Sequence, residues 1–227
     1  MTTVAVILAR IGSKRLPGKV MRSVNGKPLL GHLLDRVGVC CGIDEIIVAS
    51  SEKPENDIIE SYCQSRRVAT FRGSEEDVLS RLDGALQSVQ ADTGVLVFSD
   101  GPLVDPRIIE KTIRIFRETE QYDFVSNDLS TSWPPGMEVE VFKARAIKDS
   151  NARCSDSKIR EHATLFIRSH PERYLLHNVD ALGKYRRPDL SFEIDEEADF
   201  VVIKKLLENF SQRTDFSLED LIKFMDE

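Results

Sequence analysis

Positive side chains and glycines follow the first apolar segment of the chain. Residues 4–8 are apolar, and residues 9–19 read ARIGSKRLPGK. Glycine allows backbone N–H groups to approach a ligand closely, and guanidinium and ammonium groups bind phosphate oxygens. A loop of this kind directly after a strand can form an anion-binding concavity. The loop therefore predicts a triphosphate-binding site, although a solvated basic turn would have the same composition.

The spacing within this loop excludes two common nucleotide motifs. It matches neither the Walker A motif nor the pattern G-x-G-x-x-G. The loop therefore argues against a P-loop ATPase and against a dinucleotide-dependent dehydrogenase.

Two aspartates far apart in the chain each follow an apolar segment. Asp100 follows VFS, and Asp195 ends SFEID. Magnesium prefers oxygen ligands and is commonly held by one or two carboxylates together with substrate phosphates and water. We therefore predict that Asp100 and Asp195 are metal ligands. The alternative is that Asp100 begins a turn and Asp195 caps the last helix.

The composition is that of an ordinary globular protein. The 227 residues carry a formal net charge of -7, with 41% hydrophobic and 30% charged residues. The acidic balance argues against a nucleic-acid partner. No apolar run is long enough to span a membrane, so we expect no membrane partner. With no secretory signal visible, we expect a cytoplasmic location. The four cysteines and four histidines lack metal-ligand spacing, so we expect reduced structural thiols.

Strand-like and helix-like segments alternate through the first half of the chain. Strands are predicted at 4–8, 45–50, 68–73 and 94–104, and helices at 28–40, 55–65, 74–89 and 105–119. This order predicts an α/β fold with a doubly wound, mostly parallel sheet, whose ligands bind where the strands end. Ser74 and Asp77 have capping-box spacing, and Asp105 is the expected N-cap of the helix that starts at Pro106.

The alternation changes near residue 122. Strands are predicted at 122–128, 136–142, 174–181 and 190–196, and helices at 143–154, 157–174 and 197–210. No linker or repeat interrupts the chain. The simplest organisation is one domain over 1–227, with an elaborated segment at about 128–190.

Eight motifs resemble those of a known family in the same order. They are ARIGSKRLPGKV, NGKPLL, FRGSEEDVLSR, SDGPLVDP, VSND, PPGMEVEVF, REHATLFIR and FEIDEEADF, and they lie within residues 4–203. The chain thus resembles the acylneuraminate and 3-deoxy-manno-octulosonate (Kdo) cytidylyltransferases, and most closely the spore-coat polysaccharide subgroup. The resemblance implies a nucleotidyltransferase domain of the nucleotide-diphospho-sugar transferase type that uses CTP and Mg²⁺. It also implies a homodimer, with residues 129–170 as the small dimerisation insertion.

The resemblance implies site residues by motif position. Nucleotide-binding residues would be Ala9, Arg10, Gly12, Ser13, Arg15, Lys19, Ser50, Arg72, Ser74 and Asp100. Arg15, Lys19, Asp100 and Asp195 would be catalytic, with Asp100 and Asp195 holding the metal. Ser74 would serve equally well as a simple helix cap.

A short segment supplies candidate residues for the second substrate. Arg160, Glu161 and His162 stand in KIREHATLF. A guanidinium is the natural partner of a sugar carboxylate, and a histidine can orient or deprotonate an attacking hydroxyl. The alternative for His162 is a purely structural donor.

The expected activity is transfer of CMP from CTP to an acidic sugar of the nonulosonate or 3-deoxy-ulosonate type. Pyrophosphate would leave, and the product would serve surface polysaccharide biosynthesis. Two departures bear on the acceptor: Gly101 replaces a Cys or Glu of close relatives, and Glu196-Glu197 replaces Thr-Pro. The alternatives are a phosphonate or sugar-phosphate acceptor, a glycosyltransferase of related fold, and a nucleotide-binding module without catalysis.

Overall fold

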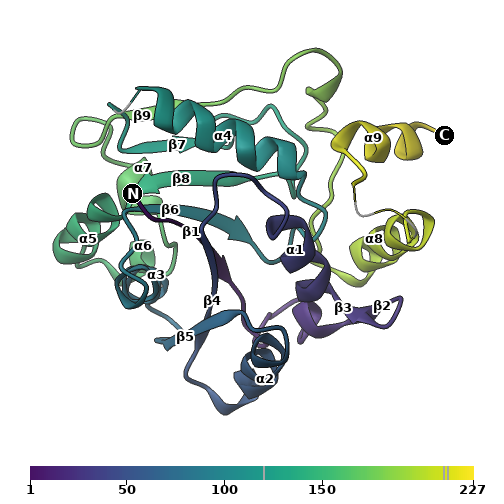
Figure 1. The fold of residues 1–227 in the computed structure, drawn as a ribbon, viewed down its shortest axis with the longest axis horizontal. Helices are drawn as coiled ribbons and strands as arrows, with labels where there is room; N and C mark the ends of the chain where they lie inside the picture. The colour runs from purple at the N-terminus through teal and green to yellow at the C-terminus, as the bar shows by residue number, and fades with distance from the viewer. Residues whose placement is uncertain (120, 212, 214) are drawn as a thin grey trace.

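A seven-stranded sheet organises the chain (Figure 1), in a computed structural model that describes residues 1–227 except 120, 212 and 214. Its strands stand in the order β5-β4-β1-β6-β8-β7-β9. Their bounds are β1 Thr3–Leu8, β4 Glu45–Ser51, β5 Ala69–Gly73, β6 Thr93–Phe98, β7 Phe124–Ser126, β8 Val139–Lys143 and β9 Leu176–Asn178. Strands β5, β4, β1 and β6 are parallel, and β8 is antiparallel to both of its neighbours. The predicted mostly parallel sheet is confirmed.

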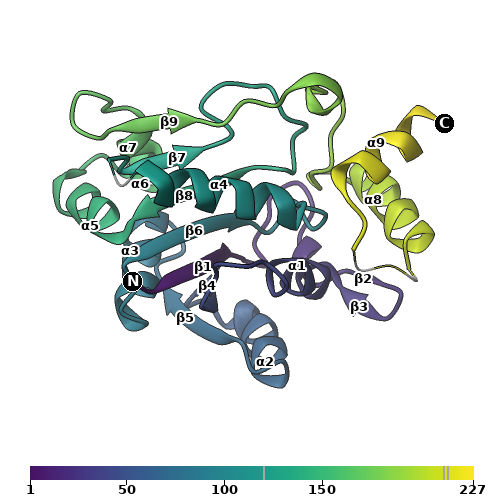
Figure 2. The ribbon, with the colours of Figure 1, turned by 45° about the horizontal axis from the view of Figure 1, so that its top comes forward.

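Helices cover both faces of this sheet (Figures 1 and 2). One face carries α1 (Leu29–Val37), α2 (Asp57–Ser65) and α4 (Pro106–Thr119), and the other carries α3 (Val78–Ser88), α5 (Ala144–Arg153), α6 (Ser157–Arg160) and α7 (Leu165–Arg168). Helices α8 (Glu197–Asn209) and α9 (Leu218–Asp226) lie together at one end of the molecule. Short elements complete the chain: η1 Lys19–Met21, β2 Ser23–Val24, β3 Lys27–Pro28, η2 Pro54–Asn56 and η3 Gly183–Tyr185.

Strand β1 shows why the sheet is covered on both sides. Val4 and Val6 pack into the apolar cluster on the α3 face, whereas Ala5 and Ile7 pack into the cluster on the α1 face. Successive side chains of a strand point to opposite faces, so a strand that is apolar throughout must be buried twice. This accounts for the uninterrupted apolar run after the N-terminus.

Two predicted elements are of a different kind in the structure, and the strand predicted over 94–104 ends at Phe98. The helix predicted over 157–174 is two short helices, α6 and α7, because residues 161–164 form a turn between them. The strand predicted over 190–196 is not a strand: this segment bonds to two loops rather than to a strand of the sheet.

The caps of the helices were predicted in part. Helix α3 begins at Val78 with Asp77 as its N-cap, so Ser74 is not the cap. The predicted cap at Asp105 is confirmed, and its second oxygen accepts from the N–H of Leu218 at 2.7 Å. Asp105 thereby ties the start of α9 to the start of α4. Helix α9 was not predicted, although its capping box was a readable signal.

Where β6 ends, the backbone at Gly101 contacts the backbone at Gly136, which in turn contacts the backbone at Phe192, with no side chains between them. A Cβ on Gly101 would lie 2.6 Å from the carbonyl oxygen of Gly136, and a Cβ on Gly136 would lie 2.5 Å from the carbonyl carbon of Phe192. The N–H of Ile194 donates to the carbonyl oxygen of Asp100 at 2.9 Å. This contact brings the segment after residue 190 against the end of β6.

We expect Gly136→Ala to destabilise the protein strongly. Gly136 has φ +91°, so alanine there meets both backbone strain and the contact with Phe192. The expected loss is about 3 kcal/mol of unfolding free energy, measured by urea denaturation. Gly183→Ala is the control, because Gly183 has φ +56° and nothing within 4 Å of its Cβ position. Its loss should be about 1 kcal/mol, and equal losses would show that the contact contributes nothing.

Candidate functional site

A cavity of about 640 Å³ opens where β1 and β6 end. The loop after β1 contributes Ala9, Arg10, Ser13, Lys14, Arg15 and Lys19 to its wall. Ser99 and Asp100, which follow β6, also line the cavity, as do residues 161–164 in the turn between α6 and α7 and Asp195. The carboxyl edge of a parallel sheet is where ligands of doubly wound folds bind.

Lys19 is the cation that joins the two predicted metal ligands. Its Nζ lies 3.2 Å from Oδ1 of Asp195 and 3.6 Å from Oδ2 of Asp100, and it also donates to the carbonyl oxygen of Ile194. Lys19 is only 9% exposed. The structure thus brings the carboxylates of Asp100 and Asp195 together at one ammonium group.

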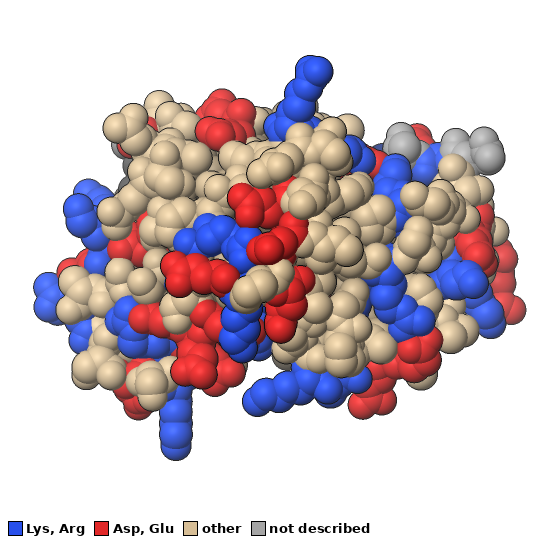
Figure 3. All heavy atoms as spheres, turned by 90° about the horizontal axis from the view of Figure 1, so that it is seen from below, with Lys and Arg blue, Asp and Glu red and all other residues tan. Residues whose placement is uncertain are grey.

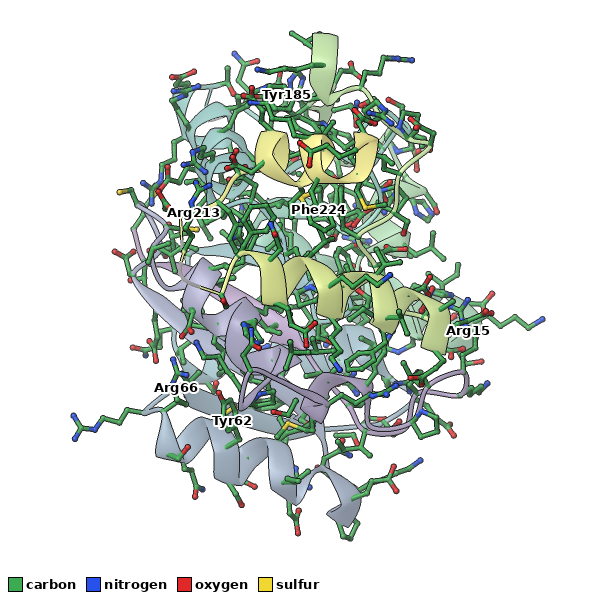
Figure 4. All side chains as sticks on the ribbon, turned by 90° about the vertical axis from the view of Figure 1, so that its right-hand side faces the viewer. Arg15, Tyr62, Arg66, Tyr185, Arg213 and Phe224 are labelled. Atoms are coloured by element: carbon green, nitrogen blue, oxygen red, sulfur yellow. The ribbon has the colours of Figure 1, made fainter. Side chains whose placement is uncertain are left out.

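The surroundings of the two aspartates differ. Burial raises the pKa of Asp100, against the opposing charge of Lys19. Asp195 also pairs with Arg15, whose Nη2 lies 2.7 Å from its Oδ2, and Figure 4 shows Arg15 beside one end of α8. The side chain of Asp199 accepts from the N–H groups of Asp195 and Glu196 and so fixes the backbone that carries Asp195. Asp195 does not cap α8, because Glu196 and Asp199 form its capping box.

This pair of carboxylates fits a divalent cation that is completed by a substrate. Among the described residues, no group of three or more His, Cys, Asp or Glu side chains could hold a metal. Magnesium needs only one or two carboxylates when phosphates and water supply its other ligands. The two aspartates and the adjoining basic loop have that chemistry.

Three polar atoms without hydrogen-bond partners lie around the ends of β4 and β5. They are Oγ of Ser50, Oε2 of Glu75 and Nε of Arg81, all buried. Glu75 also accepts from Arg10 at 2.9 Å, which links this group to the cavity wall. Glu75 and Arg81 were not predicted as site residues, although both stand in the motif FRGSEEDVLSR.

Two predicted arginines lie in the framework, outside the cavity wall. The guanidinium of Arg72 donates to the carbonyl oxygens of residues 51 and 53 and to the carboxylates of Asp57 and Glu60. Arg160 donates to Asp77 at 2.9 Å and to carbonyl oxygens at the end of α5. Each arginine thus connects secondary-structure elements, and neither presents a free guanidinium to a ligand.

Of the other predicted site residues, some line the cavity and some do not. Glu161 and His162 line the cavity, whereas Gly12, Ser50 and Ser74 do not. The hydroxyl of Ser74 accepts from the N–H of Asp77 at 3.0 Å. Gly12 leaves little room for a side chain, because a Cβ there would lie 3.2 Å from Glu55 and 3.3 Å from Glu75.

A second cavity of about 350 Å³ adjoins the first and shares Phe98, Asp100 and Arg168 with it. Its wall includes Asp128, Glu138 and Glu193. Burial and the nearby Glu193 raise the pKa of Glu138 to about 8. Burial likewise raises the pKa of Glu140, which lines the first cavity, to about 7, against the charge of Arg168. None of these groups was predicted, because they stand in segments whose pattern indicates strands.

The chain belongs to the cytidylyltransferase family, whose model matches residues 4–222. It is 33% identical over 226 residues to the spore coat polysaccharide biosynthesis protein SpsF of Bacillus subtilis, covering 97% of this chain and 92% of that protein. It is 31% identical over 120 residues to the 8-amino-3,8-dideoxy-manno-octulosonate cytidylyltransferase of Shewanella amazonensis, covering 52% and 48% of the two chains.

Solved structures show the same fold. A cytidylyltransferase from Leptospira borgpetersenii superposes with a TM-score of 0.94 at 25% identity, covering 100% of this chain and 94% of that one. A CMP-2-keto-3-deoxy-manno-octonic acid synthetase complexed with CTP superposes with a TM-score of 0.71 at 17% identity, covering 92% and 99%. The expected nucleotidyltransferase fold is thereby confirmed.

None of the described helices combines the length and the apolar character that a bilayer-spanning segment needs.

We expect Glu138→Gln to flatten the pH dependence of stability. The folded-state pKa of Glu138, about 8, lies above its ordinary value of 4.5. The folded state therefore holds a proton that the unfolded state releases, and stability falls as pH rises from about 5 to about 8. Glutamine cannot ionise, so the variant should lose less unfolding free energy over this range in urea denaturation. The exposed Glu172→Gln is the control, and equal pH slopes for all three proteins would contradict the prediction.

Proposed function

We propose that this cytidylyltransferase transfers CMP from CTP to a hydroxyl of an acidic sugar and releases pyrophosphate. The observation that carries the proposal is the meeting of the basic loop with Asp100 and Asp195 around Lys19. The names of relatives support a sugar-type acceptor, since two refer to spore coat polysaccharide and to an octulosonate. In this reaction the acceptor oxygen bonds to the α-phosphorus while the bond to pyrophosphate breaks.

The basic loop would bind and neutralise the triphosphate. Arg15 and Lys19 are ion-paired with Asp195 in the free protein. Phosphate oxygens can replace that carboxylate as their partner, and Asp195 is then available to a cation. Asp100 and Asp195 would hold Mg²⁺, which when bound supplies positive charge to the phosphate oxygens. Such a reaction depends on positioning and charge neutralisation more than on a protein nucleophile.

The unpartnered polar atoms support cytosine as the base. The edge of cytosine presents one amino donor and two acceptors, its ring nitrogen and its carbonyl oxygen. Oε2 of Glu75 is an acceptor, whereas Nε of Arg81, a residue of the cavity wall, can donate. Uracil presents a carbonyl where cytosine has its amino group, so a carboxylate there favours cytosine.

The acceptor would lie between the turn at 161–164 and Asp100. His162 lines this side of the cavity and would accept a proton from the attacking hydroxyl. Because Arg160 lies outside both cavities, we assign the sugar carboxylate to Arg168, which lines both and whose guanidinium would exchange its pairing with Asp128 and Glu140 for the ligand. A guanidinium binds a carboxylate through paired N–H groups.

Three sequence predictions remain proposals: the homodimer, the cytoplasmic location and the role in surface polysaccharide biosynthesis. On the face shown in Figure 3, basic and acidic side chains are interspersed, and no broad basic surface covers it. This distribution of charge does not favour a nucleic-acid partner.

A comparison of the four ribonucleoside triphosphates tests the nucleotide. With Mg²⁺ present, CTP should raise the melting temperature more than UTP, ATP or GTP at equal concentration. Stabilisation follows the affinity for the folded state, about 2.7 kcal/mol at a hundredfold excess over the dissociation constant. Glu75→Gln should narrow the difference between CTP and UTP. A larger shift with ATP would overturn the assignment of cytosine.

Asp100→Asn tests the catalytic carboxylate. The substitution keeps the size of the side chain and removes its charge, so pyrophosphate release should fall more than about 100-fold. CTP should still raise the melting temperature, because the basic loop is unchanged. Asp215→Asn is the matched control, since that exposed side chain lies outside both cavities. Near-full activity of Asp100→Asn would remove Asp100 from the reaction.

A further inference from the structure

Arg160 uses its whole guanidinium within the protein. Its Nε and Nη2 lie 2.9 and 2.7 Å from Oδ2 of Asp77, and Nη2 also donates to Oδ1 of Asn151 at 2.6 Å. Nη1 donates to the carbonyl oxygens of Asn151 and Cys154 at 3.0 and 2.7 Å. A guanidinium has five N–H donors in a planar fork, so these bonds occupy all of them.

Asp77 receives this guanidinium while it caps α3. Its Oδ1 accepts from the N–H of Ser80 at 2.9 Å, which is the N-cap bond, and its Oδ2 accepts from Arg160. One carboxylate therefore fixes the start of α3 against the end of α6. Because the other partners of Arg160 stand at the end of α5, three helices are joined at this point.

Asp77 stands between Glu75 and Arg81 in the chain and bonds to the backbone on both sides. Its N–H donates to Oγ of Ser74 at 3.0 Å, and its carbonyl oxygen accepts from the N–H of Arg81 at 3.1 Å. Nη1 of Arg81 returns to the same segment and donates to the carbonyl oxygens of Ser74 and Glu75. The position of Asp77 therefore sets the positions of both Glu75 and Arg81.

Glu75 and Arg81 each hold a buried polar atom for which position is decisive. Oε2 of Glu75 and Nε of Arg81 have no hydrogen-bond partner among the described residues. Hydrogen bonds weaken steeply outside a narrow range of distance and angle. A group that fixes the start of α3 can therefore control what these two atoms bind without touching the ligand itself.

We propose that Arg160 is a positioning residue for recognition of the nucleotide base. This inference rests on the proposed function, in which Glu75 and Arg81 bind the edge of cytosine. Arg160 acts through Asp77 and holds the first turn of α3 where the acceptor of Glu75 and the donor of Arg81 match that edge. It thereby determines the choice between CTP and UTP although it lines neither cavity.

This role requires an arginine and not merely a positive charge. The partners of Arg160 are oxygens on three different residues, and the planar fork reaches all of them at once. A lysine would keep the charge opposite Asp77, but its donors radiate from a single atom at the end of a flexible stem. Arg160→Lys therefore separates the geometry of the group from its charge.

Calorimetric titration of the full chain with CTP and with UTP, both with Mg²⁺, tests the inference. The wild-type protein should bind CTP at least about tenfold more tightly than UTP, because the bond to the Glu75 carboxylate is a charged one. In Arg160→Lys this ratio should fall to about threefold or less, since the fork is lost. An arginine that only stabilised the fold would lower both affinities alike, so an unchanged ratio in Arg160→Lys would overturn the inference.

Asp77→Asn is a second variant that keeps the helix cap. Asparagine caps a helix as well as aspartate does, but its neutral amide cannot replace the carboxylate that accepts from Arg160. The ratio should fall as it does in Arg160→Lys. Arg153→Gln is the matched control, because it removes an arginine at the same end of α5 whose Nε donates to Asp149 at 2.7 Å. An equal fall of the ratio in Arg153→Gln would count against the inference as strongly as no fall in Asp77→Asn.

A double variant tests the path from Arg160 to the base. Residues that act through one hydrogen-bond network have non-additive effects. Adding Arg160→Lys to Glu75→Gln should therefore change the ratio of CTP to UTP affinity little beyond its value in Glu75→Gln alone. A further fall as large as that of Arg160→Lys in the wild-type background would contradict the proposed path. Circular dichroism verifies that each variant is folded before titration.

The two proposals fail in different ways. If the wild-type protein binds UTP as tightly as CTP, the assignment of cytosine falls, and this inference falls with it. If the wild-type protein prefers CTP and both Arg160→Lys and Asp77→Asn retain that preference, only the positioning role of Arg160 falls.

Discussion

The site around Asp100 and Asp195 depends on the close packing of three backbone segments of the chain, at Gly101, Gly136 and Phe192. Asp100 and Asp195 come from segments almost a hundred positions apart, and the two glycines let the backbones of these segments approach with no side chain between them. The bond from the Ile194 N–H to the Asp100 carbonyl sets the two aspartates side by side. A larger residue at either glycine would separate them, so the carboxylate pair is a product of backbone packing.

Two like charges held together in this way need a cation between them. In the free protein Lys19 is that cation, and Arg15 adds a second one at Asp195. Under the proposed function, phosphates would pair with the basic side chains in place of Asp195, and a divalent ion would take the carboxylates. Each charged group would then keep a partner of opposite charge, so binding would not leave a buried charge unpaired.

The sheet and the basic loop could be predicted from the sequence because both are local patterns. Apolar runs alternate with amphipathic segments, and the basic loop is continuous in the chain. Arg72 and Arg160 could not be placed in the same way, since their partners are acids and carbonyls that only the tertiary structure brings near. Glu138 and Glu140 alternate with Val139 and Val141, which is the pattern of any strand with one polar face. Whether such a face meets solvent or a buried cavity depends on what packs over it, here the segment carrying Arg168.

The two cavities together form a site whose two ends differ in charge. The basic loop lies in the first cavity, the carboxyl groups of Asp128, Glu138 and Glu193 line the second, and Asp100 and Arg168 belong to both. Under the proposed function, the basic loop would attract the triphosphate, and the second cavity, where Arg168 is the cation among the described lining residues, would be left to the acceptor. The local charge of each cavity would thus distinguish two substrates that the overall net charge of the protein would treat alike.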